Sequence, residues 1–275
     1  MFVPKLGVSA HCLWPKVTPE AIAAVAPSNI ATLEIFPSLF ADDREGALGA
    51  LQGLLASTDI RAMSVHCAFG ANLDFSSLDS DIHAAALEAA YDALELAAAL
   101  AAPMVVLHAS AEPILPPDRE QRTRQALALL TEITPAYADA GVRGALELLP
   151  RSCLCNSVAE LNAFLDQLDP GVFGVCLDVN HAMGDYRALP DMVRTLGPRL
   201  MTTHLSDYDG VDEKHWMPGR GIINWAQLMT ALADIDYQGP FNYESQIEGD
   251  TPQERVRSLE QNYAWLSGLL EPSAP

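Results

Sequence analysis

The sequence predicts an α/β protein that folds as a single-domain (β/α)8 TIM barrel. Eight short apolar stretches alternate with longer helical patterns along the 275 residues, close to the size of about 250 residues that is typical of one such barrel. Polar residues recur late in most of these stretches, on average about 33 residues apart, the length of one βα unit. An open sheet gathers its site at one switch point, whereas a closed ring brings all strand ends to one mouth. The recurrence therefore favours the barrel.

The expected strands are rich in Val, Leu and Ile, and several are nearly continuous apolar runs. Such runs are typical of parallel strands that are buried on both faces. The strands are expected over residues 6–11, 32–37, 62–68, 104–110, 144–150, 173–180, 200–206 and 240–245.

Capping and stop signals place the helices between these strands. Thr18 precedes Pro19 at one helix start, and a long Ala/Leu run over 79–101 ends before Pro103. No linker or low-complexity segment divides the chain, so one domain is expected over 1–270, followed by a loose tail over 271–275. Two further starts fit a capping box, Ser157 with Glu160 and Thr251 with Glu254.

Composition excludes several classes of partner. The formal net charge of −20, from 16 Lys and Arg against 36 Asp and Glu, repels phosphate polymers and anionic membranes, so nucleic acid is an unlikely partner. No membrane span and no signal peptide are expected. The five cysteines are odd in number and lack CxxC spacing, which indicates neither a disulfide framework nor an all-cysteine zinc site and suggests a cytoplasmic location. Cys153 and Cys155 alone are a weak metal signal.

Four strand ends carry the strongest chemical signal: Glu147, Asp178, His204 and Glu244 each interrupt an apolar stretch. A buried carboxylate costs several kcal/mol unless it is paired or binds a metal. Three carboxylates at one barrel mouth also repel one another, so the set predicts a shared divalent cation, Mn2+, Mg2+, Co2+ or Zn2+. Each residue taken alone also fits a buried polar group satisfied by the backbone.

The sequence lacks the motifs that indicate a nucleotide cofactor or a serine nucleophile. The sequence contains neither GxGxxG nor GxxxxGK[ST], so no nucleotide cofactor is expected. No GxSxG stretch supports a serine nucleophile.

Seven segments, in this order, resemble the xylose isomerase-like TIM barrel superfamily, which includes sugar phosphate isomerases and epimerases, inosose dehydratases and endonuclease IV of AP endonuclease family 2. The resemblance implies that Glu147 and Glu244 both bind the metal and form the catalytic acid/base pair, while Asp178 and His204 complete the ligand set. The segments are SVHCAF, VVLHAS, ALELLP, CLDVNHA, HLSDYDG, HWMPGRG and NYES.

The resemblance also implies a second group of contacts. His181 is expected to contact substrate or metal. His66, His108, Glu213 and His215 match positions that bind additional zinc ions in endonuclease IV, while in sugar-acting relatives such histidines bind substrate hydroxyls. A structural histidine is the alternative for His66, His108 and His215.

Weaker candidates come from the loops. Arg151 and Arg220, like Arg187 and Lys214, fit either one phosphate or carboxylate of a substrate or simple surface charge balance. Trp14, near His11, fits a wall over a sugar ring or core filling. The best-known ketohexose epimerases carry a glutamate where this chain has Cys153, which departs from their pattern. Glu34 is expected on the barrel floor or behind the ligands, and His83 is expected to be exposed.

Three functions follow. The first is a divalent-metal-dependent isomerase or epimerase of a sugar, sugar derivative or polyol, which transfers a proton through an enediolate; a β leaving group would turn the same chemistry into a lyase or dehydratase reaction. The second is an endonuclease IV-like multinuclear zinc phosphoesterase. The third is a barrel that binds a small ligand without catalysis. The resemblance leaves a homo-oligomer open.

Overall fold

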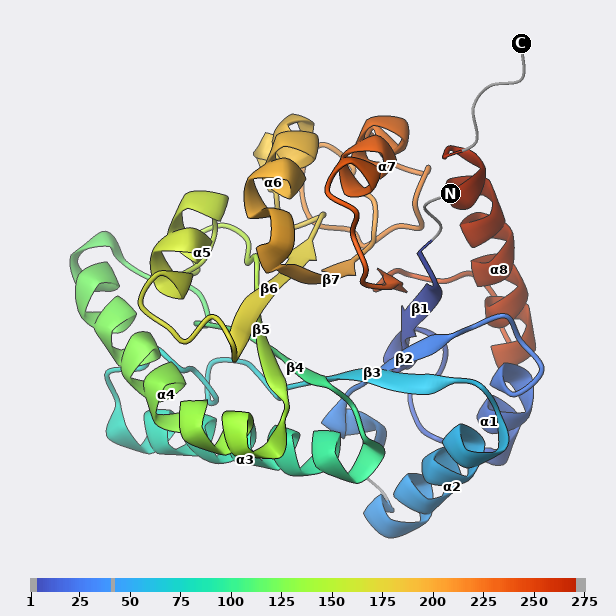
Figure 1. The fold of residues 1–275 in the computed structure, drawn as a ribbon, viewed down its shortest axis with the longest axis horizontal. Helices are drawn as coiled ribbons and strands as arrows, with labels where there is room; N and C mark the ends of the chain where they lie inside the picture. Colours follow the sequence, from blue (N-terminus) through green and yellow to red (C-terminus); the bar gives the residue numbers. More distant parts are fainter. Residues whose placement is uncertain (1–3, 41–42, 271–275) are drawn as a thin grey trace.

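The computed structural model describes residues 4–40 and 43–270, and it confirms the (β/α)8 barrel. Parallel strands form the centre and the helices surround them (Figure 1). The tail predicted at 271–275 lies outside the described residues. The strands are β1 (Leu6–Ser9), β2 (Thr32–Ile35), β3 (Arg61–His66), β4 (Met104–Leu107), β5 (Arg143–Glu147), β6 (Phe173–Asp178), β7 (Leu200–His204) and β8 (Phe241–Tyr243).

From β1 to β7, each strand pairs with the next strand in the sequence, and β1 also pairs with β8. Between β7 and β8, the Leu205 N–H donates to Asn242 O at 2.8 Å and the Glu244 N–H donates to Leu205 O at 3.2 Å, which completes the ring. Asp178 is in register with His204 across β6 and β7. The register therefore places two of the predicted ligands side by side.

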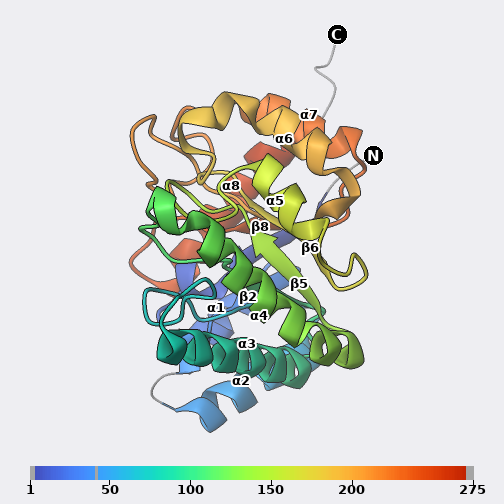
Figure 2. The same cartoon turned by 90° about the vertical axis from the view of Figure 1, so that its left-hand side faces the viewer.

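The helices alternate with the strands and cover the outside of the barrel. Figure 2 shows α3 and α4 lying along one another on this outer surface. No helix of the described residues is both long enough and apolar enough to cross a bilayer. The helices are α1 (Pro19–Val25), α2 (Arg44–Ser57), α3 (Ser80–Leu100), α4 (Arg119–Ala140), α5 (Val158–Leu165), α6 (Leu189–Leu196), α7 (Trp225–Asp234) and α8 (Pro252–Gly268).

The predicted helix starts form with one difference. Thr251 and Glu254 make a complete capping box at α8, in which each side chain accepts from the backbone of the other. The Ser157 hydroxyl accepts from Glu160 N–H at 3.2 Å, but the Glu160 carboxylate contacts Asn156 N–H and Arg119 instead of closing the box. The second box is therefore only half formed, because Arg119 competes for the carboxylate.

The two-residue repeat of the strands explains how the chemistry reaches the barrel interior. Side chains two positions apart face the same side of a strand. Ala145 and Cys176 belong to a small apolar cluster with Met104, Val106 and Met201. Glu147 and Asp178 follow two residues later, at the carboxyl ends of the strands. The polar groups therefore lie on the same face as this cluster, at the end of the barrel formed by the carboxyl ends of the strands.

Candidate active site

The structure brings the four predicted metal ligands together. Glu147, Asp178 and His204 end β5, β6 and β7, and Glu244 follows β8 directly. One ligand atom from each of the four side chains lies within 4.8 Å of the others. The first three side chains are at most 1% exposed, and that of Glu244 is 15% exposed. This is a compact donor set of three carboxylates and one imidazole.

The Glu147 carboxylate contacts several histidine rings. Its Oε1 is 3.2 Å from His204 Nδ1, and its Oε2 is 2.9 Å from His108 Nε2 and 3.2 Å from His66 Nε2. Burial opposes ionisation of this carboxyl, but His204 and His108 outweigh it and hold the pKa of Glu147 well below its usual range. The group is therefore a carboxylate at neutral pH.

His204 is held by a carboxylate on each side. Its Nε2 lies 3.0 Å from Glu34 Oε1, and its Nδ1 lies 2.8 Å from Glu244 Oε2. Glu34 is fully buried and accepts hydrogen bonds from Ser9 Oγ at 2.6 Å and Ser64 Oγ at 2.8 Å. Glu34 thus lies behind the histidine, and Nδ1 is directed at the other ligands.

Asp178 provides a test of whether the site suits a cation. Its Oδ1 accepts from the N–H groups of Asn180 at 2.8 Å and His181 at 3.2 Å. Its Oδ2 is buried without a hydrogen-bond partner, and burial raises the pKa of this carboxyl. An unsatisfied buried carboxylate oxygen is costly, and a divalent ion would satisfy it. The donor set therefore fits a divalent metal.

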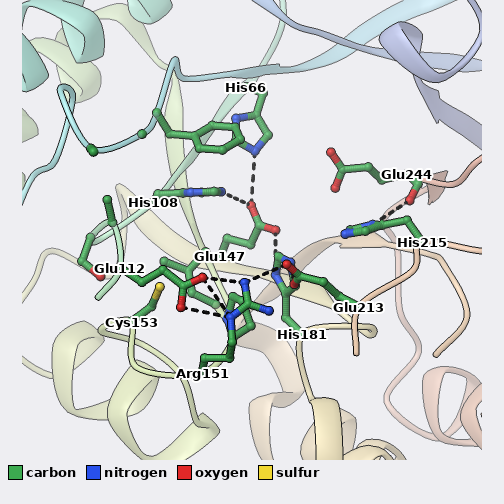
Figure 3. Close-up of a pocket in the computed structure, with 17 residues that line it drawn as sticks. His66, His108, Glu112, Glu147, Arg151, Cys153, His181, Glu213, His215 and Glu244 are labelled. Carbon is green, nitrogen blue, oxygen red and sulfur yellow. Dashed lines mark hydrogen bonds and ion pairs between the residues drawn. The ribbon is translucent and has the colours of Figure 1, made fainter. Parts of the chain in front are cut away.

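The residues of the second predicted group surround these four. His66 and His108 form a further metal-capable group with Glu147, and His181 and His215 form another with Asp178. The Nδ1 of His181 donates to Leu148 O at 2.9 Å, which leaves Nε2 facing Glu213 Oε2 at 3.3 Å. His215 Nδ1 lies 3.2 Å from Glu244 O. Figure 3 shows these side chains converging on one cavity.

The loop after β7 carries Glu213 and His215, and Asp207 anchors it. The Asp207 carboxylate is fully buried and accepts from Gly219 N–H at 2.7 Å, Ile223 N–H at 3.1 Å and the Trp225 indole at 2.8 Å. Its backbone also pairs with Trp216. Both ends of the loop are therefore tied to one carboxylate. Asp207 was not predicted as a functional residue, although it lies within the HLSDYDG segment.

The cavity has a volume of about 360 Å³, within the usual range for a small ligand. Phe69, Ser110 and Glu112 line it without having been predicted, and they lie on loops where no periodicity marks them. The Phe69 ring is 51% exposed and lies over His108, with ring centroids 4.1 Å apart. This ring gives the polar cavity an apolar wall.

Of the weaker candidates for substrate binding, only some line the cavity. Arg151 lines the cavity, but Arg220 is absent from the lining and pairs with Glu248 at the surface. Trp14 is 2% exposed, packs in the core and does not line the cavity either, so the core-filling alternative describes it. His83 is half-buried rather than exposed, because α3 packs against α4 and its Nε2 lies 3.4 Å from Gln125 O.

The two spaced cysteines are separated from the metal-capable groups. Cys153 lines the cavity, and burial raises the pKa of its thiol to about 11. Cys155 is fully buried. Neither belongs to a metal-capable group of the described residues. Cys153 is therefore a neutral part of the cavity wall.

Comparison with known proteins places this geometry in a family. The family model described as xylose isomerase-like TIM barrel matches residues 22–268. An uncharacterized protein of Methanocaldococcus jannaschii is 26% identical over 93% of this chain and 87% of its own length. An L-ribulose 3-epimerase of Methylomonas sp. is 30% identical over 47% of this chain, and a D-psicose 3-epimerase of Enterocloster bolteae is 27% identical over 44%. These matches span only 44% and 40% of the two epimerases.

Solved structures agree in fold. A D-tagatose 3-epimerase-like protein superposes with a TM-score of 0.82 at 22% identity, covering 96% of this chain and 98% of the other. The D-psicose 3-epimerase of Clostridium cellulolyticum H10 gives 0.77 at 23% identity, covering 95% and 96%. Because the family model covers most of the sequence, the chain belongs to the xylose isomerase-like TIM barrel family.

Proposed function

We propose that the chain is a divalent-metal-dependent epimerase or isomerase that acts on a sugar, sugar derivative or polyol. The observation that carries the proposal is the convergence of Glu147, Asp178, His204 and Glu244, with one Asp178 oxygen buried without a hydrogen bond and only the His181 ring nearby, at 3.5 Å. The 3-epimerases among the relatives indicate an enzyme of the isomerase and epimerase type and a small carbohydrate substrate. A cytoplasmic location and a homo-oligomer stay predictions.

The four converging side chains would hold the metal, which we expect to be Mn2+, Mg2+, Co2+ or Zn2+. When bound, a divalent ion supplies positive charge that acidifies the C–H bond beside a substrate carbonyl. Glu34 fixes the His204 ring so that Nδ1 faces the other ligands. Glu34, which does not line the cavity, thus orients the one nitrogen donor among the four proposed ligands.

Glu147 and Glu244 are the proposed acid/base pair. Both line the cavity, and they come from β5 and from the end of β8. Burial opposes ionisation of Glu244 as well, but His204 outweighs it and lowers the pKa of that carboxyl. Two carboxylates are therefore ready to accept a proton. One carboxylate removes the proton to give an enediolate and is itself protonated. For epimerisation, the other carboxylate must first take up a proton from solvent, which it then delivers to the opposite face of the carbon; for isomerisation, a proton is delivered to the adjacent carbon instead.

Substitution of the pair tests this assignment. Glu147→Gln and Glu244→Gln should each lower turnover by roughly 10²–10⁴-fold or more, because an amide cannot take the proton. Glu120→Gln on α4, whose side chain is 87% exposed, is the matched control and should keep full activity. Ketose and aldose mixtures incubated with metal-loaded protein are followed by chromatography. A Glu147→Gln variant with undiminished turnover would contradict the role.

A second candidate function rests on the neighbouring groups. The three overlapping metal-capable groups suit more than one zinc ion, as in an endonuclease IV-like phosphoesterase. Three zinc ions per chain and cleavage of a duplex with an abasic site would favour it. The net charge of −20 opposes binding to a phosphate polymer.

A lyase or dehydratase reaction is the other alternative, and it needs only a leaving group beside the carbon that loses its proton.

A further inference from the structure

Glu112, on the loop after β4, contributes a carboxylate to the cavity that the proposed metal and proton chemistry does not use. In Figure 3 it lies with Arg151 and Cys153 on one side of the cavity, and Glu244 and His215 lie on the other. Its side chain is 34% exposed. It is therefore open to a ligand.

Arg151 holds this carboxylate in place. The Arg151 Nε donates to Glu112 Oε1 at 2.9 Å and to Oε2 at 3.0 Å, and Nη2 donates to Oε1 at 2.5 Å. The carboxylate still has lone pairs for hydroxyl donors, because an ionised carboxylate offers about four acceptor sites. Arg151 therefore orients the Glu112 carboxylate and still leaves some of its acceptor sites for a ligand.

The same contacts neutralise Arg151. Its Nη2 also donates to Glu213 Oε1 at 2.8 Å, and its Nη1 donates to Asp212 Oδ1 at 3.3 Å. The lining residues, all within the described part of the chain, include no other Lys or Arg. Three carboxylates, those of Glu112, Asp212 and Glu213, thus surround one guanidinium, and His181 also faces Glu213, so the wall offers a ligand acceptors rather than a free cation.

We propose that Glu112 is a specificity-determining residue. Its carboxylate accepts hydrogen bonds from the terminal hydroxyl groups of an unphosphorylated sugar and repels the terminal phosphate of a sugar phosphate. The inference rests on the proposed function and adds the charge of the substrate to it. Glu112 and Glu213 act together, since Arg151 ties both to the same wall. Like charges placed opposite each other reject wrong partners effectively.

Matched sugars test the proposal. Metal-loaded protein is given D-fructose or D-fructose 6-phosphate, and D-ribulose or D-ribulose 5-phosphate, and both turnover and calorimetric binding are measured. The wild-type protein should favour the free sugar in each pair. Glu112→Gln should narrow that preference by about tenfold, because it removes one negative charge and releases part of the Arg151 guanidinium.

Glu120→Gln is the control, since it removes one exposed carboxylate that does not line the cavity. Its free-sugar preference should equal that of the wild-type protein. A wild-type preference for the phosphates, or an equal effect of the two variants, would overturn the inference and leave the proposed function standing. Failure of every sugar to bind metal-loaded protein would count against the proposed function for ketoses, and the inference would fall with it.

Discussion

Glu34 illustrates how a residue outside the cavity controls the chemistry inside it. Its carboxylate comes from β2 and joins Ser9 of β1, Ser64 of β3 and His204 of β7. A histidine that donates one ring N–H to a carboxylate presents the other nitrogen in a fixed direction and with raised basicity. The position of the proposed nitrogen ligand is therefore set by contacts between four strands.

Replacing this carboxylate should weaken metal binding. Glu34→Gln keeps the shape but loses the charge behind His204, so the affinity for Mn2+ should fall about 10–100-fold. Titration calorimetry on metal-free protein measures it. Ser64→Ala removes only one hydrogen bond to Glu34 and should have a smaller effect. An unchanged Mn2+ affinity in Glu34→Gln would show that the ring needs no such partner.

Glu213 gives a pH-dependent contribution to stability. The hydrogen bond to His181 is the largest cause that lowers the pKa of this carboxyl, to about 2, and Arg151 adds to it. A carboxyl with a depressed pKa in the folded state stabilises that state above its unfolded pKa of 4.5, and the contribution is lost as the pH falls toward 2. The contribution should therefore be complete at neutral pH and shrink below pH 4.5.

Urea unfolding of wild-type and Glu213→Gln protein in EDTA measures this effect. The difference between their free energies of unfolding should be larger at pH 6 than at pH 3.5. A difference that is equal at both pH values would mean that the ion pairs of Glu213 do not stabilise the folded state.

Individual residues could be singled out from the sequence only where they break a pattern. Glu147 and Asp178 could be recognised because each is a carboxylate inside an apolar strand, and burial there demands a partner. Glu112 and Asp207 lie on loops, where a carboxylate is unremarkable. Their roles depend on contacts with Arg151 and Trp225, which lie 39 and 18 residues away in the sequence. Such contacts leave no local signal.

At the scale of elements, the strands fix the proposed ligands, while a long loop delivers Glu213 and His215. The PGRG turn closes this loop against Asp207. A Cβ added at Gly221 would lie 2.2 Å from Tyr208 O and 2.5 Å from Asp207 Oδ1. The glycine is therefore required by close backbone approach.

Gly221→Ala should displace the loop without disturbing the barrel. We expect faster hydrogen exchange over 207–223 and a KM raised about tenfold or more, because Glu213 and His215 lose their positions. Mn2+ affinity should stay nearly unchanged, since the four proposed ligands lie on strands or directly after one. Gly184→Ala is the control, because nothing lies within 4 Å of its added Cβ. Equal kinetics in both variants would refute the role of the loop.

At the scale of the whole molecule, the barrel was predictable because its repeat is global. Apolar strands and late polar residues recur with the length of a βα unit, and ring closure follows from the pairing of β1 with β8. The outer packing was not predictable in the same way. Trp14, near the end of β1, fitted either a wall over a sugar ring or core filling, and only the structure shows that its large ring packs in the core.

A metal that links four strands should stabilise the entire barrel. Mn2+ at about 100 times its dissociation constant adds roughly 2.7 kcal/mol to the free energy of unfolding. For a domain of this size, that corresponds to a rise in Tm of several degrees. Scanning calorimetry with Mn2+ and with EDTA measures it, and Asp178→Asn should abolish the difference. Equal Tm values for wild-type protein would favour a barrel that binds ligands without metal.

We infer that Glu147, Asp178, His204 and Glu244 share one cation. A crystal grown with Mn2+ and measured at the manganese absorption edge tests it directly. We expect an anomalous peak within about 2.0–2.3 Å of all four side chains. An absent peak, or one bound by other residues while these four side chains point apart, would contradict it.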